Sequence, residues 1–232
     1  SEKSPKYLRQ DNWRMLTSKL GQDSWVFQTV YNRKNSGFFV EAGASDGTSL
    51  SNTFILEKHG WTGILIEPSP AFDLINKNRF CCTDHRALGK ASDVEEEFLI
   101  DFHNQDNRCS AFERYFNANS IRGLDEEREI VHDTVKTVCL MELLEENKAP
   151  DFIEYLSLNI EGAEVEVLES LDFNRYTFGT ITISHRCKHV QRSSIYGILV
   201  MNGYRLAFDA GIEDWYVHDS IKCDLHASRR GL

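Results

Sequence analysis

The sequence predicts an α/β protein whose central sheet is mostly parallel. Apolar runs at 38–40 and 64–66 have the length and composition of strands buried on both faces of such a sheet. Between these runs, apolar residues recur at helical spacing from Thr48, and Gly60 stands where such a helix would end. A strand, a helix and a second strand in this order are typical of a parallel sheet.

The first strand leads into a turn of small residues, 43–47, which reads Gly-Ala-Ser-Asp-Gly. Such a turn lets the backbone approach a ligand closely, and a helix after it points its N–H groups at that ligand. Glu67 follows the second run a little over 20 residues after the turn, close to where nucleoside-binding α/β folds place a ribose-binding carboxylate. A carboxylate can accept from both ribose hydroxyls at once. We therefore expect a nucleoside ligand here, with a turn that serves packing alone as the alternative.

The residue pattern of this turn narrows the choice of nucleoside. The dinucleotide pattern Gly-x-Gly-x-x-Gly is absent, and Glu-x-Gly-x-Ser-x-Gly stands in its place at 41–47. This is closer to the acidic, glycine-rich turn that cradles S-adenosylmethionine.

Composition limits the partners that the protein can have. Of 232 residues, 41% are hydrophobic and 27% are charged, as in an ordinary globular protein of one main domain. Asp and Glu number 36 against 26 Lys and Arg, and the formal net charge is −10. Since an acidic surface repels phosphate backbones, we expect no nucleic-acid partner. No apolar run has the length of a membrane span, so we expect no membrane segment in this chain.

The six cysteines form no C-x-x-C pair and indicate neither a zinc module nor a dense disulfide scaffold. Whether the cysteines form disulfide bridges is not decided by their spacing. The sequence has no Asn-x-Ser/Thr sequon for N-glycosylation, and this slightly favours a cytoplasmic location. The lumen of the secretory pathway is the alternative if a segment ahead of Ser1 has been removed.

A zinc site is conceivable but is not our expectation. In an extended chain His185, Cys187 and His189 would share one side, and Cys223 and His226 could complete a ligand set. Nothing else in the sequence supports this arrangement. We therefore expect no metal.

The chain divides into an N-terminal helical extension at 1–36 and a main domain at 37–232. Residues 91–133 are the least regular part of that domain, and we interpret them as an insertion on the substrate side, where specificity usually resides. The remaining patterns predict helices at 69–79, after 159 and at 193–201, and strands that end at 159 and lie at 181–184, 204–209 and 215–218.

Three stretches of sequence, in order, resemble a known family. They are Gly-Phe-Phe-Val-Glu-Ala-Gly-Ala-Ser-Asp-Gly at 37–47, Leu-Ser-Asn-Thr with Gly-Trp-Thr-Gly-Ile-Leu-Ile-Glu-Pro at 50–68, and Tyr-Leu-Ser-Leu-Asn-Ile-Glu-Gly-Ala-Glu at 155–164. Through them the chain resembles the FkbM-type methyltransferases. The resemblance implies a Rossmann-like class I methyltransferase fold, with a seven-stranded, mostly parallel sheet, helices on both faces and a final antiparallel strand. It also implies methyl transfer from S-adenosylmethionine to a hydroxyl of a small molecule or carbohydrate.

Site residues follow from the resemblance position by position. Glu67 would hold the ribose hydroxyls. A third strand with its loop is expected at 81–88, and this third-strand loop would border the adenine, with Asp84 as a candidate partner of its amino group or else a solvated acid. Asn159 would lie beside the transferable methyl, where the family usually has Asp. Because an amide cannot act as a base, Asn159 could orient a substrate but could not deprotonate it. The turn residues that would line or close the methionine and ribose site are Glu41, Gly43, Ala44, Asp46 and Gly47.

The reaction would also need a base to take the proton of the acceptor. The candidates are His185, at the end of a strand, and Asp84 or His85 in the third-strand loop, because the carboxyl ends of parallel strands face the ligand crevice. Each could instead be a polar loop residue. A protein that keeps the fold and binds or regulates without turnover is the alternative function, and the fold alone does not decide between the two. The acceptor and the oligomeric state stay open.

Overall fold

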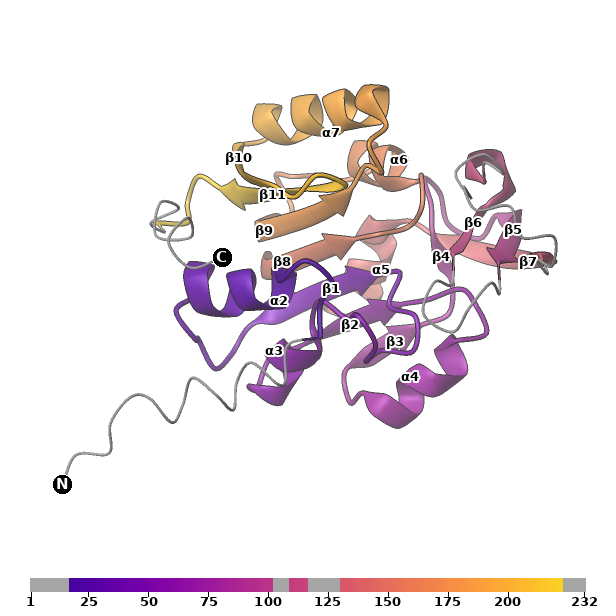
Figure 1. Ribbon diagram of the computed structural model, residues 1–232, viewed down its shortest axis with the longest axis horizontal. Coiled ribbons are helices and arrows are strands. Elements are labelled where there is room, and N and C mark those ends of the chain that lie inside the picture. Colours follow the sequence, from indigo (N-terminus) through magenta and orange to yellow (C-terminus); the bar gives the residue numbers. More distant parts are fainter. Residues whose placement is uncertain (1–16, 102–108, 117–129, 223–232) are drawn as a thin grey trace.

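The computed structural model describes residues 17–101, 109–116 and 130–222 and contains two sheets. The larger sheet has seven strands in the order β10-β11-β9-β8-β1-β2-β3, and the smaller has the order β4-β7-β5-β6 (Figure 1). The strands of the larger sheet are β1 (Phe38–Ala42), β2 (Thr62–Ile66), β3 (Cys82–Asp84), β8 (Phe152–Leu158), β9 (Thr177–Ser184), β10 (Tyr204–Asp209) and β11 (Glu213–His218).

The large sheet is mixed, whereas a mostly parallel sheet with one final antiparallel strand was expected; the last strand, β11, is indeed antiparallel to its neighbours. The pairs that join β3, β2, β1, β8 and β9 are parallel. β11 pairs antiparallel with both β9 and β10. The short connection between β10 and β11 explains this, because strands joined by a tight hairpin can only pair antiparallel.

Helices cover both faces of the large sheet (Figure 1). Along β1, Val40 packs with the core under one set of helices, whereas its neighbour Phe39 packs with the core under the other set, because successive side chains of a strand point to opposite faces. The first set is α5 (Leu140–Glu146), α6 (Glu164–Glu169) and α7 (His189–Met201). The second set is the π-helical segment η1 (Trp25–Val30), which continues α2 (Gln22–Ser24), with α3 (Phe54–Lys58) and α4 (Phe72–Asn78).

The helix expected from Thr48 begins only at Phe54, with α3. The residues before it are held in a non-helical loop by two acidic side chains. Asp46 accepts hydrogen bonds from the backbone N–H groups of Thr48 and Ser49 at 2.8 and 2.7 Å. Glu41 accepts from the backbone of Asn52 at 2.7 Å. Acidic side chains that bond nearby backbone offer it an alternative to helix, which the apolar pattern alone did not reveal.

Residues of the expected insertion build most of the second sheet. Its strands are β4 (Ala87–Leu88), β5 (Glu95–Asp101), β6 (Cys109–Phe112) and β7 (Ile130–Val138), and a short 3-10 helix, η2 (Glu113–Tyr115), follows β6. β5 pairs antiparallel with both β6 and β7. Phe98 of β5 and Phe112 of β6 lie opposite each other and pack edge to face, with ring centroids 5.8 Å apart.

The described part of the N-terminal extension packs onto the large sheet. Trp25 and Phe27 are buried, and the ring of Trp25 lies 5.0 Å from that of Trp215 on β11. Among the described residues, none of the helices combines the length and the apolar character needed to span a membrane.

Candidate functional site

A cleft opens where the carboxyl ends of β1, β2 and β8 meet the second sheet. Parallel strands end at the same edge of a sheet, so the residues that follow these three strands come together there. One side of the cleft is polar and belongs to the strand ends, and the other is largely apolar and belongs to the second sheet. The lining residues are Gly43, Ser45, Ile66, Glu67, Pro68, Ser69, Ala87, Leu88, Phe98, Ser110, Phe112, Asn159, Ile160 and Glu161.

Glu67 belongs to the polar side of the cleft, directly follows β2 and is 4% exposed. Its carboxylate accepts from the backbone N–H of Ser45 at 2.7 Å and from that of Ser69 at 2.9 Å. Burial raises the pKa of Glu67, although these hydrogen bonds act in the opposite direction. The side chain of Ser69 is a further hydrogen-bond partner of this carboxylate. The carboxylate joins the turn after β1 to the turn after β2, and of its roughly four lone-pair sites about one remains for a ligand.

The turn after β1 packs against the loop after β8 at very short range. Gly43 has φ +81°, a conformation that L residues rarely adopt. A Cβ atom at this position would lie 2.1 Å from the backbone carbonyl oxygen of Asn159. Gly43 and Ala44 both donate their N–H groups to the carbonyl of Ile66, at 3.0 and 3.2 Å. The glycine therefore allows three strand ends to meet at one point.

Three other predicted residues of the turn support its shape instead of lining the cleft. Glu41 is buried, and its carboxylate binds the loop ahead of α3, including the hydroxyl of Ser51 at 2.8 Å. Asp46 holds the start of that loop, and Gly47 offers its carbonyl to the buried guanidinium of Arg79 at 2.8 Å. Arg79 also pairs with Glu57 at 2.9 Å. Arg79 was not predicted, because no short sequence motif contains it.

The third-strand loop lies beside Glu67, but its side chains point to other partners. The backbone carbonyl of Asp84 accepts the N–H of Glu67 at 3.0 Å. The carboxylate of Asp84 pairs with Arg86 at 2.7 Å, so it already has a charged partner. His85 is exposed and stacks on Phe72, with ring centroids 4.5 Å apart. Neither Asp84 nor His85 is among the residues that line the cleft.

The loop after β8 carries Asn159, Ile160 and Glu161 to the cleft. Asn159 is exposed and directly follows β8. The carboxylate of Glu161 forms an ion pair with Arg186. A helix was expected after 159, and α6 begins only at Glu164.

His185 lies away from the cleft, buried beneath the loop between β10 and β11. Its Nε2 is 3.6 Å from a carboxylate oxygen of Asp214 on β11. Its backbone N–H donates to the carbonyl of Ile212 at 3.0 Å, and its Nδ1 accepts from the N–H of Cys187 at 3.2 Å. Burial lowers the pKa of His185, opposed by the charge of Asp214. Of the predicted catalytic residues, only Asn159 therefore lines the cleft.

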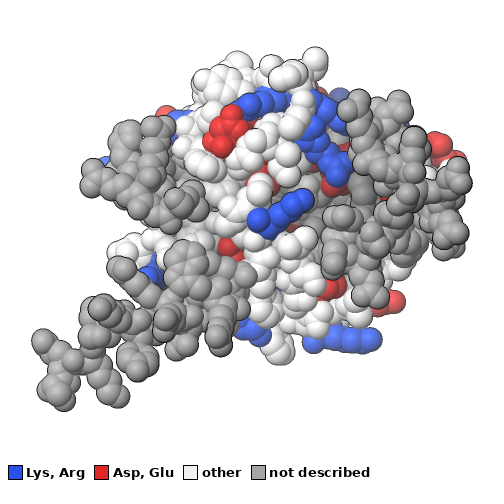
Figure 2. Space-filling view, viewed as in Figure 1, with Lys and Arg blue, Asp and Glu red and all other residues white. Residues whose placement is uncertain are grey.

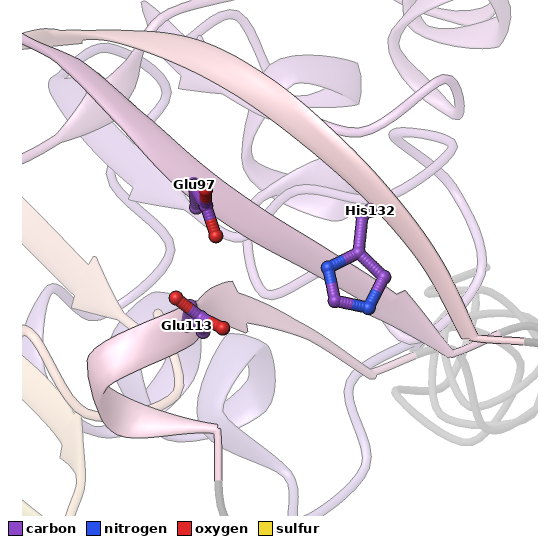
Figure 3. A group of neighbouring side chains, drawn as sticks. All are labelled: Glu97, Glu113 and His132. Carbon is purple, nitrogen blue, oxygen red and sulfur yellow. The ribbon is translucent and has the colours of Figure 1, made fainter.

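Among the described residues, a group that could hold a metal ion occurs on the second sheet (Figure 3). Glu97 of β5, Glu113 of η2 and His132 of β7 place their ligand atoms within 4.8 Å of one another. All three side chains are exposed, and none lines the cleft. The zinc set considered from sequence includes Cys223 and His226, which lie outside the described residues.

The fold and the cleft together define an α/β protein with a cleft at the carboxyl ends of parallel strands. The family model described as the methyltransferase FkbM domain matches residues 41–206, which is well over half of the chain. The chain therefore belongs to the FkbM methyltransferase family. No curated protein matches it.

Several lining residues were not predicted from the sequence. Phe98, Ser110 and Phe112 come from the second sheet, and only the pairing of β5 with β6 brings them to the cleft. Their place within residues 91–133, expected on the substrate side, is the one signal that the sequence offered.

Proposed function

We propose that this protein binds S-adenosylmethionine and transfers its methyl group to a hydroxyl of a small molecule or glycan, on a Rossmann-like methyltransferase fold. The observation that carries the proposal is the buried carboxylate of Glu67 at the polar side of the cleft, with acceptor capacity left for a hydroxyl donor. Its place after β2, beside the glycine turn after β1, supports a ribose as the group that it binds.

The charge of the cleft supports a cationic nucleoside over a phosphate-bearing one. Its lining includes two carboxylates, Glu67 and Glu161, and neither Lys nor Arg among the described residues. The N–H groups of Gly43, Ala44 and Ser45 are already taken by Ile66 and Glu67, so the turn offers no cradle for phosphate. A sulfonium ion, by contrast, is attracted by nearby carboxylates.

Figure 2 shows both basic and acidic side chains on the visible described face, with several of the basic ones close together. Support for a small acceptor therefore comes from the cleft. The apolar side of the cleft, which includes Phe98 and Phe112, suits the body of an organic molecule or the face of a sugar ring.

When bound, S-adenosylmethionine supplies an already activated methyl group. The protein then has to exclude water, align the acceptor oxygen and receive its proton. Asn159 can donate a hydrogen bond through its amide nitrogen and accept one through its oxygen, which suits the alignment role. His85 is our candidate base because it is exposed and follows β3 near Glu67, although its side chain stacks on Phe72 and does not line the cleft.

One observation favours a second candidate function, which is ligand binding without turnover. None of the expected bases lines the cleft, and an amide, Asn159, stands where the family usually has an acid. A binding protein needs the cofactor contacts but no base.

Two measurements distinguish the candidates. Calorimetry with S-adenosylmethionine should give a saturable binding isotherm, and incubation with the methyl-labelled compound and a panel of sugars and small alcohols should transfer label to a hydroxyl. Binding without any labelled product would favour the non-catalytic protein. Absence of binding would overturn both candidates, provided that the folded state is verified by circular dichroism.

A further inference from the structure

The loop that carries Asn159 and Glu161 to the cleft is held from behind by one buried carboxylate. Glu164, the first residue of α6, is 1% exposed. Its carboxylate accepts from the backbone N–H of Ile160 at 3.1 Å and from that of Gly162 at 2.9 Å. A third donor, the side-chain amide of Gln191 on α7, lies 2.7 Å away. Glu164 thus connects the cleft loop to two helices of the core.

The loop adopts a conformation that needs such support. Glu161 has φ +64°, which is uncommon for a residue with a side chain, and Gly162 has φ +135°. A Cβ atom at Gly162 would lie 2.6 Å from Tyr115 of η2. Backbone in these regions persists where the surroundings hold it in place, and two of the donors that Glu164 binds are N–H groups of this very segment.

The groups around Glu164 determine how easily its carboxylate ionises. Burial raises the pKa of Glu164 to about 7, and the charge of Glu161 adds to the effect against the hydrogen bonds from the loop. Glu161 is itself paired with Arg186. The neighbour that α7 places beside Glu164 is Gln191, whose amide does not titrate. On the side of η2, Tyr115 and Arg114 bind Glu166. A protonated carboxyl has fewer acceptor sites than a carboxylate, so it holds the loop less firmly.

We propose that Glu164 is a positioning residue: its ionised carboxylate holds the loop that bears Asn159 and Glu161 in the form that binds ligand, and protonation of Glu164 releases it. The inference rests on the proposed function for the identity of the ligand, but the hold on the loop does not depend on it. Glu164 itself is not among the residues that line the cleft, so it acts through the loop.

The first test needs no ligand. In isotope-labelled wild-type protein, the amide signals of Ile160 and Gly162 are followed by nuclear magnetic resonance between about pH 5.5 and 8.5. Both should titrate together with a midpoint of about 7. In Glu164→Gln neither should titrate, whereas in the exposed control Glu169→Gln both should behave as in wild type. The proposal would be overturned if these amide signals did not shift with pH in wild type, or if they titrated in Glu164→Gln as they do in wild type.

The second test uses S-adenosylhomocysteine, the demethylated product, as the probe in calorimetry. Wild type and Glu169→Gln should bind it roughly 3–10-fold more weakly at pH 6 than at pH 8, and Glu164→Gln should show no such change. Titrating amides with a pH-independent affinity in wild type would overturn the link between the loop and the ligand. If wild type binds no probe at either pH, the proposed function fails, and the amide titration still decides whether Glu164 holds the loop.

Discussion

The backbone carbonyl oxygen of Asn159 lies 2.1 Å from the point that a Cβ atom of residue 43 would occupy. The turn after β1 and the loop after β8 can therefore meet only because residue 43 is glycine. This contact determines where Asn159 lies relative to Glu67, and both line the same cleft.

Gly43→Ala should both destabilise the protein and weaken ligand binding. The added methyl group meets backbone, and residue 43 has φ +81°, so the turn must move. We expect a loss of roughly 1–3 kcal/mol in the free energy of unfolding, measured with urea, and weaker binding of S-adenosylhomocysteine. The matched control is Gly197→Ala in α7, where nothing lies within 4 Å of the new Cβ. That change should stabilise by about 0.5–1 kcal/mol, because alanine favours helix. Equal effects at the two positions would contradict the packing that we describe.

Asn159→Ala should lower turnover by a factor on the order of 10–100, because positioning of the acceptor is lost while no base is removed. Asn159 is exposed, so the free energy of unfolding should change by no more than about 0.5 kcal/mol. Asn159→Asp should fold and keep or raise activity. Steady-state kinetics decide the matter, with exposed Asn174→Ala as control. Unchanged turnover in Asn159→Ala would show that Asn159 does not position the acceptor.

The free energy of unfolding should depend on pH through the ionisation of Glu164. Burial, reinforced by Glu161, raises the pKa of Glu164 from 4.5 to about 7 in the folded state. The stabilisation from this group is therefore complete below pH 4.5 and is lost as the pH rises through 7. Relative to wild type, Glu164→Gln should gain stability between these limits, by up to roughly 3 kcal/mol. Urea denaturation at several pH values measures it. A constant difference between the two proteins would show that Glu164 ionises as freely in the fold as in the unfolded chain.

Removal of metal should leave ligand binding unchanged. Glu97, Glu113 and His132 lie together on the second sheet, but none of them lines the cleft. Binding of S-adenosylhomocysteine should therefore be the same with and without a chelator, and the same in His132→Ala. A loss of binding in both experiments would make a metal ion part of the site.

The sequence was sufficient for features that depend on local patterns. The strand predicted at 204–209 coincides with β10, and the strand expected to end at 159 is β8, which ends at Leu158. Gly43, Glu67 and Asn159 follow parallel strands directly, so their common edge could be predicted from topology. All three line the cleft.

Contacts between separate segments of the chain could not be predicted from the sequence. Glu41 was expected to touch the cofactor, but its carboxylate is engaged 10 to 12 residues further on, by Ser51, Asn52 and Thr53. His185 was expected at the ligand crevice because it follows β9, yet the antiparallel β11 brings Asp214 beside it and buries it. Neither relationship has a periodic or motif signal, because each depends on how separate elements pack.

Titration of Glu67 variants with S-adenosylmethionine tests the central claim most directly. Glu67→Ala should weaken binding by roughly 1.5–3 kcal/mol, the range for loss of a hydrogen bond to a charged group. Exposed Glu169→Ala should bind as wild type. Calorimetry gives the affinities, and circular dichroism verifies that each variant is folded, which matters because Glu67 also binds the N–H groups of Ser45 and Ser69. Wild-type affinity in folded Glu67→Ala would contradict the assignment of the ribose site to this carboxylate.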